Sequence, residues 1–357
     1  MLRASDIGDG RIQTAELVLI SHDVDKANPR TRLRPGDVVI VLVGRIGEAA
    51  CVTSEHEGWQ AARSLAVVRC ADPALAEWLR VWLASPTARA WCLTHATGSA
   101  QATLGVTKLR KLPVPLPSAD VRDRTLHAVK VIEARIAVNE RIARTAVALA
   151  DAHFAAAAFD RSTWLQCRFE DIANAWTGSS TKPAEPLAEG KGTAWAAPAD
   201  VLHSPLPYLD RTAERVGGDP AVHPPNTLLV APKAGEVRAA INQVPMAVGR
   251  GVLAVQPSNV ADIWWLLHEI RSRSGELSTL GQGTRARELS ARALLQAAVS
   301  LPPIDTMRRF AHLASTLHAR ALTAARESRT LRPLLTASLP LEVPTTPTLA
   351  RLGATRR

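Results

Sequence analysis

The chain has 357 residues, 46% of them hydrophobic, so it is long enough for two globular domains and too apolar for a disordered protein. Lys and Arg number 43 against 33 for Asp and Glu, a formal net charge of +10. This balance favours a polyanionic partner, with nucleic acid ahead of an anionic membrane. A GC-rich coding sequence, which also enriches Arg and Ala, is the alternative explanation.

The cysteines and the apolar segments argue against several classes of protein. The four cysteines are widely spaced with no CxxC pair, which argues against a zinc ribbon and against a disulfide framework. The longest apolar run, Val38 to Val43, is far too short to span a bilayer. The first 13 residues lack the apolar core of a signal peptide. We therefore expect a cytoplasmic protein with no membrane partner.

The first part of the chain predicts a small α/β domain. A turn at Leu33–Asp37 precedes a buried strand at Val38–Val43, and a second strand is expected at Ser64–Arg69. Pro73 then opens a helix whose apolar face carries Trp78 and Trp82. Their helical spacing, like that of Trp264 and Trp265 later in the chain, favours core packing over stacking on bases.

A long helix follows this domain. The segment Leu112–Pro117, which we call the proline ladder, has a proline at every second position. These prolines hold the chain extended. After it, neither Pro nor Gly occurs for about forty residues, and apolar side chains recur at steps of three and four, as in a coiled coil. We expect Asn139, on the same stripe, to be a register-setting polar pair. The stripe consists of Val129, Ile132, Ile136, Ala143, Ala146 and Ala150.

The pattern then begins again, with a period of about 187 residues. His223–Val230 repeats the turn and strand, Gly251–Gln256 the second strand, and Ile263–Leu267 the Trp-bearing helix. Gly283–Leu289 repeats Gly98–Leu104, and Leu301–Pro303 repeats the exit ladder. A second long helix starts near Ile304, with a stripe that includes Met307, Phe310, Ala314, Leu317, Ala321, Ala324, Ser328 and Leu331.

The sequence thus predicts an α/β (α+β) fold of two tandem domains, each followed by a long helix, with the helices pairing as an antiparallel coiled coil. The residues expected to pair the helices are Ile132, Ile136, Asn139, Phe310, Leu317 and Ala324. The expected boundaries are 1–118 for the first domain, 119–160 for its helix, 165–303 for the second domain, 304–339 for its helix and 340–357 for a disordered tail.

The copies differ at their starts. About thirty residues of the second domain precede Asp200–Val201, whereas almost nothing precedes the matching Asp6–Ile7. We expect the first domain to lack its opening strand, or the start codon to have been placed too late.

No catalytic or metal-binding motif is present. The chain lacks a Walker A loop, a GxGxxG after a strand, HExxH and GxSxG, and the ten histidines are scattered. His312 and His318 lie six residues apart on a helix, a poor spacing for metal ligands. We expect a chain without catalytic residues, metal or cofactor.

Each copy does carry a polar loop followed by basic residues. Hydroxyls and Lys can reach phosphates, and Arg and Gln can read guanine and adenine edges. A solvated surface charge is the alternative for each residue, but the cluster recurs at the same place in both copies. The candidate DNA-binding residues are Arg45, Ser99, Gln101, Lys108 and Arg110 in the first copy, and Lys233, Gln282, Thr284, Arg285 and Arg287 in the second.

These residues resemble the DNA-specificity (S) subunit of type I restriction–modification systems. Leu33–Gly47 is similar to the family's strand that is preceded and followed by glycines. Thr97–Pro117 is similar to the segment at the end of the family's domain, which begins with Gly-Ser and ends with Pro-Leu-Pro. Val131–Glu140 is similar to the start of the spacer helix, and Phe169–Gly178 to the opening of a target-recognition domain. The second copy departs from the pattern with Pro225-Asn226 where Gly-Asp is usual, and with a degenerate exit.

The resemblance implies two target-recognition domains, each reading half of a bipartite double-stranded DNA site, and helices that set the spacing and dock two methyltransferase subunits. Catalysis and S-adenosylmethionine would belong to those adenine methyltransferase partners, and cleavage to motor subunits. Two alternatives stay open: a recognition subunit of another modification-based phage-defence system, and a coiled-coil scaffold with no role on DNA.

Overall fold

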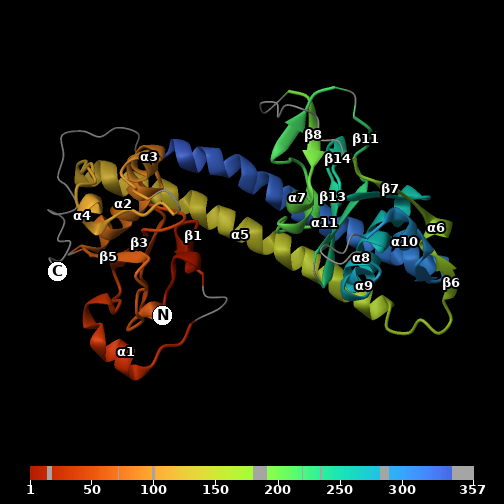
Figure 1. Ribbon diagram of the computed structural model, residues 1–357, viewed down its shortest axis with the longest axis horizontal. Coiled ribbons are helices and arrows are strands. Elements are labelled where there is room, and N and C mark those ends of the chain that lie inside the picture. Colours follow the sequence, from red (N-terminus) through yellow and green to blue (C-terminus); the bar gives the residue numbers. More distant parts are fainter. Residues whose placement is uncertain are drawn as a thin grey trace. The chain divides into compact units, whose positions relative to one another are not determined.

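The computed structural model describes residues 1–13, 18–70, 72–98, 101–179, 191–218, 220–233, 235–281 and 289–339. The chain divides into two compact units: unit 1 comprises Met1–Ala137 and Ser328–Arg357, and unit 2 comprises Val138–Glu327. Two long helices, α5 (Ala119–Ala157) and α11 (Ile304–Ala337), contribute residues to both units (Figure 1). Within the described ranges, no helix combines the length and apolar character that crossing a membrane requires.

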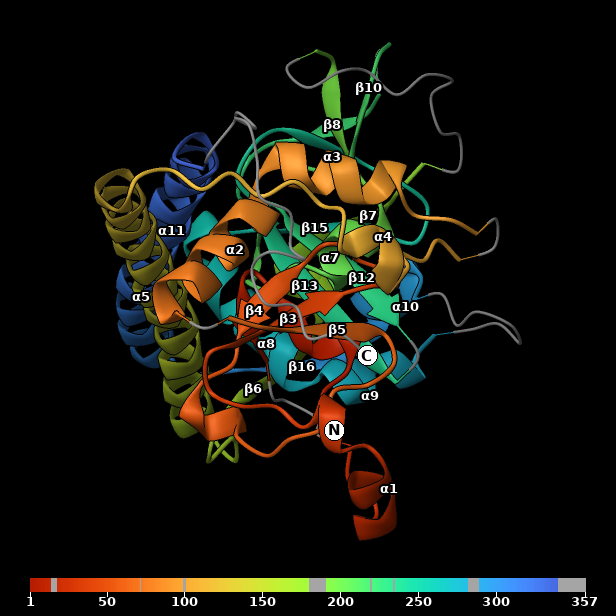
Figure 2. The same ribbon diagram turned by 90° about the vertical axis from the view of Figure 1, so that its left-hand side faces the viewer.

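Unit 1 is built on a three-stranded antiparallel sheet in the order β4-β3-β5. All five residues of β3 are buried, because Val38 and Ile40 face one core cluster and Val39 and Val41 face another. Helix α2 packs over the first of these faces (Figure 2). The elements of unit 1 before α5 are β1 (Ile7–Gly8), β2 (Arg11–Ile12), α1 (His22–Ala27), β3 (Asp37–Val41), β4 (Ala49–Cys51), β5 (Leu65–Arg69), α2 (Pro73–Ala84), α3 (Pro86–Thr94) and α4 (Val106–Leu109), with short 3-10 turns at Ala4–Asp6, Pro29–Thr31 and Ser54–His56.

Unit 2 contains a five-stranded sheet, β7-β15-β12-β13-β9, and a four-stranded sheet, β10-β8-β14-β11. Strand β12 repeats the alternation of β3, since Leu228 and Val230 face one cluster and Leu229 and Ala231 face another. The elements are β6 (Leu165–Arg168), α6 (Phe169–Ile172), β7 (Ala173–Thr177), β8 (Thr193–Ala196), α7 (Pro198–Leu202), β9 (Tyr208–Leu209), β10 (Glu214–Val216), β11 (Val222–His223), β12 (Leu228–Lys233), β13 (Glu236–Asn242), β14 (Met246–Val248), β15 (Leu253–Pro257), a 3-10 turn (Val260–Asp262), α8 (Ile263–Ser272), α9 (Ser274–Thr279), α10 (Ala291–Gln296) and β16 (Ala298–Leu301).

The repeat is visible in individual backbone hydrogen bonds. In unit 1 the Gly36 amide donates to the carbonyl of Val52 at 2.9 Å, and in unit 2 the Asn226 amide donates to the carbonyl of Asn242 at 3.0 Å. Gly36 has a φ of 88° and Asn226 a φ of 65°, so both residues adopt the left-handed conformation. Asn tolerates this region better than other residues with a side chain. Asn226 thus takes the place of Gly36, one residue later than a match of Pro225-Asn226 with Gly36-Asp37 would put it, and the turn is preserved.

The predicted tryptophan packing is confirmed. Trp78 and Trp82 are buried in the core of unit 1, and Trp265 is buried in unit 2. Trp264 is half-buried and lies flat on the ring of His318, with centroids 4.2 Å apart. The indole N–H of Trp78 donates to the carbonyl of Pro115 at 2.6 Å, and that of Trp82 to the carbonyl of Pro113 at 2.9 Å. The proline ladder is thus fastened to α2 through its carbonyls, although prolines have no N–H to donate.

Helices α5 and α11 pair in opposite directions. In unit 2, Phe154 near the end of α5 packs with Met307 and Phe310 near the start of α11. Further along, Ala143 and Ala146 of α5 pack with Ala321 and Ala324 of α11. In unit 1, Val129 and Leu126 pack with Leu335 and Leu339. The contacts run in opposite order along the two helices, as an antiparallel pair requires.

Candidate functional site

In unit 1 the predicted polar loop is anchored at both ends. Thr97 and Thr103 exchange backbone hydrogen bonds of 3.0 and 2.8 Å, and the Leu104 amide donates to the carbonyl of Leu42. Leu104 and Leu109 are buried. Gln101, which precedes Leu104, and Lys108, which precedes Leu109, are exposed. The loop therefore presents polar side chains from a fixed base.

The other candidates of unit 1 have different surroundings. Arg110, directly after α4, is half-buried, and Ser99 lies outside the described residues. Arg45 pairs with Glu48 at 3.3 Å and donates to the carbonyl of Ile7. Arg45 thus fastens β1 to the loop after β3, with its side chain 54% exposed.

In unit 2 most of the candidates cannot be placed. Gln282, Thr284, Arg285 and Arg287 lie outside the described residues. Lys233 is the last residue of β12, where its main chain is opposite Glu236 of β13. The segment 282–288 is flanked by buried Leu277 in α9 and buried Leu289.

Of the predicted helix-pairing residues, Phe310, Leu317 and Ala324 of α11 lie in clusters that also contain residues of α5. Ile136, Phe310 and Ala324 are buried, and Ile132 and Leu317 are half-buried. Asn139 is completely buried, but neither its side-chain oxygen nor its side-chain nitrogen has a hydrogen-bond partner among the described residues. The polar pair expected at Asn139 is therefore not formed among the described residues.

A buried ionic cluster fastens α2 to the part of α5 that belongs to unit 1. The guanidinium of Arg80 in α2 makes hydrogen bonds of 2.9 and 3.0 Å to both carboxylate oxygens of Glu133 in α5, and of 2.7 Å to Glu77. The side chain of Arg80 is only 5% exposed. Burial alone would lower the pKa of Arg80, but the two carboxylates outweigh it and raise that pKa. This is a fork-to-carboxylate contact, the strongest kind of side-chain hydrogen bond.

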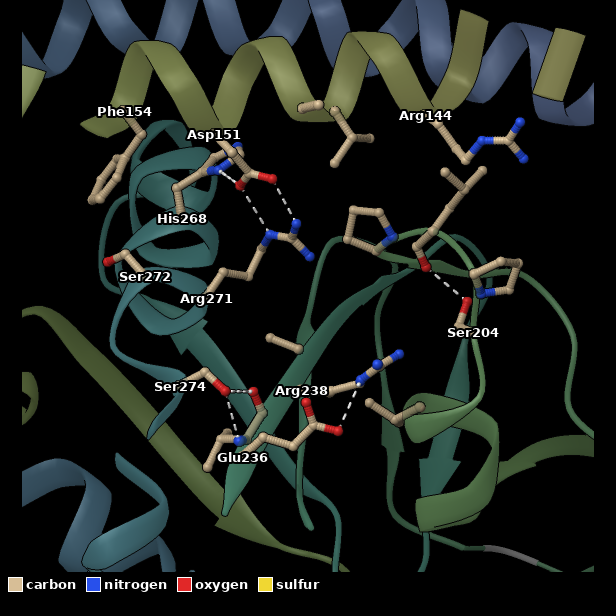
Figure 3. A pocket seen from close by; sticks show the side chains of 18 of the residues that line it. Arg144, Asp151, Phe154, Ser204, Glu236, Arg238, His268, Arg271, Ser272 and Ser274 are labelled. Atoms are coloured by element: carbon tan, nitrogen blue, oxygen red, sulfur yellow. Dashed lines mark hydrogen bonds and ion pairs between the residues drawn. The ribbon is translucent and has the colours of Figure 1, made fainter. Parts of the chain in front are cut away.

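In unit 2 the corresponding place holds a chain of hydrogen bonds. Nδ1 of His268 in α8 lies 2.7 Å from a carboxylate oxygen of Asp151 in α5, and its Nε2 lies 2.9 Å from Nε2 of His318 in α11. Nδ1 of His318 contacts the hydroxyl of Tyr208. Arg271 makes two further hydrogen bonds to Asp151, at 3.1 and 2.7 Å. Figure 3 shows Asp151 reaching from α5 towards His268 and Arg271.

The ionisation states of this network follow from its surroundings. Burial lowers the pKa of His318 to about 3, so its ring is neutral. Burial also raises the pKa of the Tyr208 hydroxyl, which stays protonated. Burial alone would raise the pKa of Asp151, but the hydrogen bonds from His268 and Arg271 hold it well below its usual range.

One arrangement of protons then satisfies every member. Tyr208 donates to Nδ1 of His318, Nε2–H of His318 donates to Nε2 of His268, and Nδ1–H of His268 donates to Asp151. These groups are committed to holding α5, α8 and α11 together. A third proton, on Nε2 of His268, would place two N–H groups face to face across 2.9 Å.

Beside this network lies a cavity of about 550 Å³ within unit 2. Its charged lining comprises Arg144, Asp151, Glu236, Arg238 and Arg271 (Figure 3). Arg271 is bound to Asp151, and Arg238 pairs with Glu236 at 3.4 Å. Among the described residues, no group of three or more His, Cys, Asp or Glu is arranged to hold a metal ion.

The two polar clusters were not predicted from the sequence. The spacing of His312 and His318 argues only against metal binding, and no motif singles out His268 or Arg80. A signal was available, because His318 lies on the apolar stripe of α11 between Ala314 and Ala321. A polar residue at such a position is either buried with a partner or strongly destabilising.

No family model matches the chain. Over 131 residues it is 28% identical to the specificity subunit of the type I restriction enzyme EcoBI from Escherichia coli. The match covers 36% of this chain, and the chain spans only 27% of the length of that relative. A type I restriction–modification S subunit of M. genitalium aligns over 96% of this chain and 92% of its own, with a TM-score of 0.55 and 14% identity. The HsdS subunit of Thermoanaerobacter tengcongensis aligns over 95% of this chain and 88% of its own, with a TM-score of 0.38 and 19% identity.

The M. genitalium structure shares the fold of this chain. The predicted fold class is confirmed, with mixed helices and strands in two tandem domains and with long antiparallel helices. The predicted resemblance to specificity subunits is also confirmed: in sequence it extends over the matched 131 residues, and in fold over nearly the whole chain.

Proposed function

We propose that this chain is the DNA-specificity subunit of a type I restriction–modification complex and directs that complex to a bipartite site on double-stranded DNA. The observation that carries the proposal is the duplication, in which two equivalent domains are each followed by one of a pair of antiparallel helices. Two similar but unequal readers suit a site of two different half-sequences. The similarity to the EcoBI specificity subunit supports the same assignment.

Each domain would read one half-site through its polar loop and the basic residues that follow. In the first copy the exposed Gln101 and Lys108 are suited to a base edge and a phosphate respectively. In the second copy Gln282, Thr284, Arg285 and Arg287 would serve in the same way. The excess of positive charge supplies sequence-independent affinity for the phosphate backbone.

The long helices would set the distance between the half-sites. Helix α5 has 39 residues, which corresponds to a length of ~58 Å at about 1.5 Å per residue. On DNA this is roughly 17 base pairs at about 3.4 Å each, more than one helical turn. Each domain in this proposal occupies its own stretch of the duplex, with unspecified base pairs between them.

The chain itself would be non-catalytic. The titratable groups of the network in unit 2 are engaged with one another. Methyl transfer, with S-adenosylmethionine, would then belong to two methyltransferase subunits docked on the helices, and cleavage to motor subunits.

Coexpression of the chain with its methyltransferase, followed by genome-wide mapping of modified bases, tests the proposal. We expect a bipartite modified motif that appears only when the chain is present. Modification without the chain, or a continuous motif, would refute the assignment. Copurification with a methyltransferase but with no motor subunit would point to another modification-based defence system.

A scaffold without a DNA role makes a separate prediction. For the complex on its DNA site, contacts with about six phosphates would make affinity fall with a log–log slope of roughly −5 against salt. Binding that is absent, or insensitive to salt, would favour the scaffold.

A further inference from the structure

The two copies can be aligned residue by residue through the segments that flank the polar clusters. The exit and helix start VPLPSADVRDR (114–124) matches VSLPPIDTMRR (299–309), a shift of about 185 residues that pairs Glu133 with His318. The strands β5 and β15, LAVVR and LAVQP, match at a shift of about 188 residues. Extended along the following helices, that shift pairs Arg80 of α2 with His268 of α8.

The aligned residues make the same contact in their own units. Arg80 of α2 binds Glu133 of α5 at 2.9 and 3.0 Å, and His268 of α8 binds His318 of α11 at 2.9 Å. Arg80 is 5% exposed, and both histidines are almost completely buried. In each copy, therefore, the helix after the sheet reaches the long helix that follows its own domain through one buried polar pair.

We propose that Arg80 and His268 are equivalent positioning residues, each of which locks its domain onto its own long helix, Arg80 through Glu133 and His268 through His318.

The neighbouring packing explains why a directional contact is needed. In unit 2 one stretch of the helix pair meets through small side chains, namely Ala143, Ala146, Ala321 and Ala324, whereas Phe154 packs with Met307 and Phe310 nearer the start of α11. Alanine faces lack the interlocking side chains that fix the register between elements. A hydrogen bond tolerates little change in distance or angle, so the pair selects one placement of α8 on α11.

Asp151 and Tyr208 strengthen the second lock. Each fixes one outer nitrogen of the histidine pair, and so fixes the tautomer and the ring orientation. In the first lock Glu77 does the same for Arg80 at 2.7 Å. Each lock therefore consists of a central pair with orienting side chains, one in the first copy and two in the second.

The consequence for DNA rests on the proposed function. If each domain reads a half-site, a domain that can shift on its helix accepts more than one spacing between half-sites. Two variants test the direction of the contact. H268L/H318L replaces the pair by apolar side chains and removes direction, and it also leaves the Tyr208 hydroxyl without its partner. H268R/H318E transplants the Arg–Glu pair of the first copy.

The experiment maps modified bases in cells that express the methyltransferase with each variant. We expect wild type and H268R/H318E to modify sites with one spacer length. We expect H268L/H318L to modify sites with a spacer one base pair longer or shorter about tenfold more than wild type does, the scale of one hydrogen-bonded pair. H312L, at an exposed histidine of the same helix, is the matched control and should behave as wild type.

A single unchanged spacer in H268L/H318L would overturn the proposal, and relaxed spacing in H268R/H318E would overturn the equivalence of the two locks. Hydrogen exchange of α11 amides at 304–327 in the full chain tests the lock without DNA. We expect about tenfold faster exchange in H268L/H318L and wild-type rates in H268R/H318E. If wild type yields no bipartite motif, the proposed function fails, and exchange alone then decides whether the lock exists.

Discussion

The two copies of the domain share backbone geometry and differ in the side chains that fasten it. The turn before the central strand makes the same hydrogen bond in both, from Gly36 in one and Asn226 in the other. The contact to the following helix is an ion pair in the first copy and a histidine pair in the second. The fold tolerates this exchange because what it requires at that position is a directional buried contact and no particular chemistry.

The segments that lead out of the two domains also differ in how their backbone groups are hydrogen-bonded. In unit 2 the segment Ala298–Leu301 forms β16, paired with β6. In unit 1 the matching segment contains Pro113 and Pro115, which cannot donate to a ladder. In unit 1 the Trp78 and Trp82 indoles donate to the carbonyls of Pro115 and Pro113 in this segment. The segment that leaves the domain therefore pairs with β6 through its backbone in unit 2, and accepts hydrogen bonds from two indoles through its carbonyls in unit 1.

The largest effect is expected at the ionic lock. R80M should leave the carboxylates of Glu77 and Glu133 without their shared cation and destabilise unit 1 by about 3–5 kcal/mol, the usual cost of breaking a buried pair. Hydrogen exchange of the β3 amides under increasing urea measures this locally, since a chain of two units need not unfold in one step. The control K130M removes an exposed cation of α5 and should change the stability by less than about 0.5 kcal/mol. Equal effects of the two substitutions would contradict the role of Arg80.

The next comparison concerns the tryptophans. W82F should remove the hydrogen bond to Pro113, whereas W265F removes an indole N–H that has no partner among the described residues. Both lose similar buried area, so W82F should cost about 1–3 kcal/mol more than W265F. Local exchange of the α2 and α8 amides would measure the two costs. A larger loss for W265F would show that the ladder is not fastened through the indole.

Acid should weaken unit 2 through His318. Its pKa is lowered from an ordinary 6.5 to about 3, by burial first and then by His268 and Arg271, with Asp151 opposing. Tyr208 and the stacked Trp264 are the other side chains that face it. The unfolded chain therefore binds more protons between pH 6.5 and 3, so the stability contributed by neutral His318 is complete above about pH 6.5 and is lost as pH falls.

The loss should be at most about 1.4 kcal/mol per pH unit. Unfolding of unit 2 followed from pH 7.5 to 5 should show this slope in wild type and in H312L, and a shallower slope in H318L. The same slope in all three proteins would exclude His318 as its source.

The smallest expected effect is a gain in stability. N139L removes a fully buried amide that has no hydrogen-bond partner among the described residues, and should stabilise the helix pair by about 1 kcal/mol. N139A removes the polar group but leaves a cavity. Comparing it with N139L therefore separates the effect of losing the amide from the effect of filling the space. Thermal unfolding measures both variants. Destabilisation by N139L would mean that the amide has a partner in solution, such as a bound water.

The sequence was informative where patterns are periodic. The stripes on α5 and α11, the buried strands and the repeat each depend on spacing, which survives divergence of side chains. The polar locks could not be predicted, because Arg80 and Glu133 are 53 residues apart and His268 and His318 are 50 apart. Only the packing of α2 on α5, and of α8 on α11, brings the two members of each pair together. The recognition loops are hard for a different reason, since their residues follow the DNA sequence that is read rather than the fold.

The most direct test of the account is the length of the unspecified spacer in the modified motif after both helices are shortened. Deleting residues 138–141 from α5 and 326–329 from α11 removes about one turn, ~5.4 Å, from each helix. Both cuts lie between the contacts that fasten unit 1 and those that fasten unit 2. We expect unchanged half-site sequences and a spacer shorter by about 1–2 base pairs. An unchanged spacer with intact modification would contradict the claim that the paired helices set the distance between two DNA-reading domains.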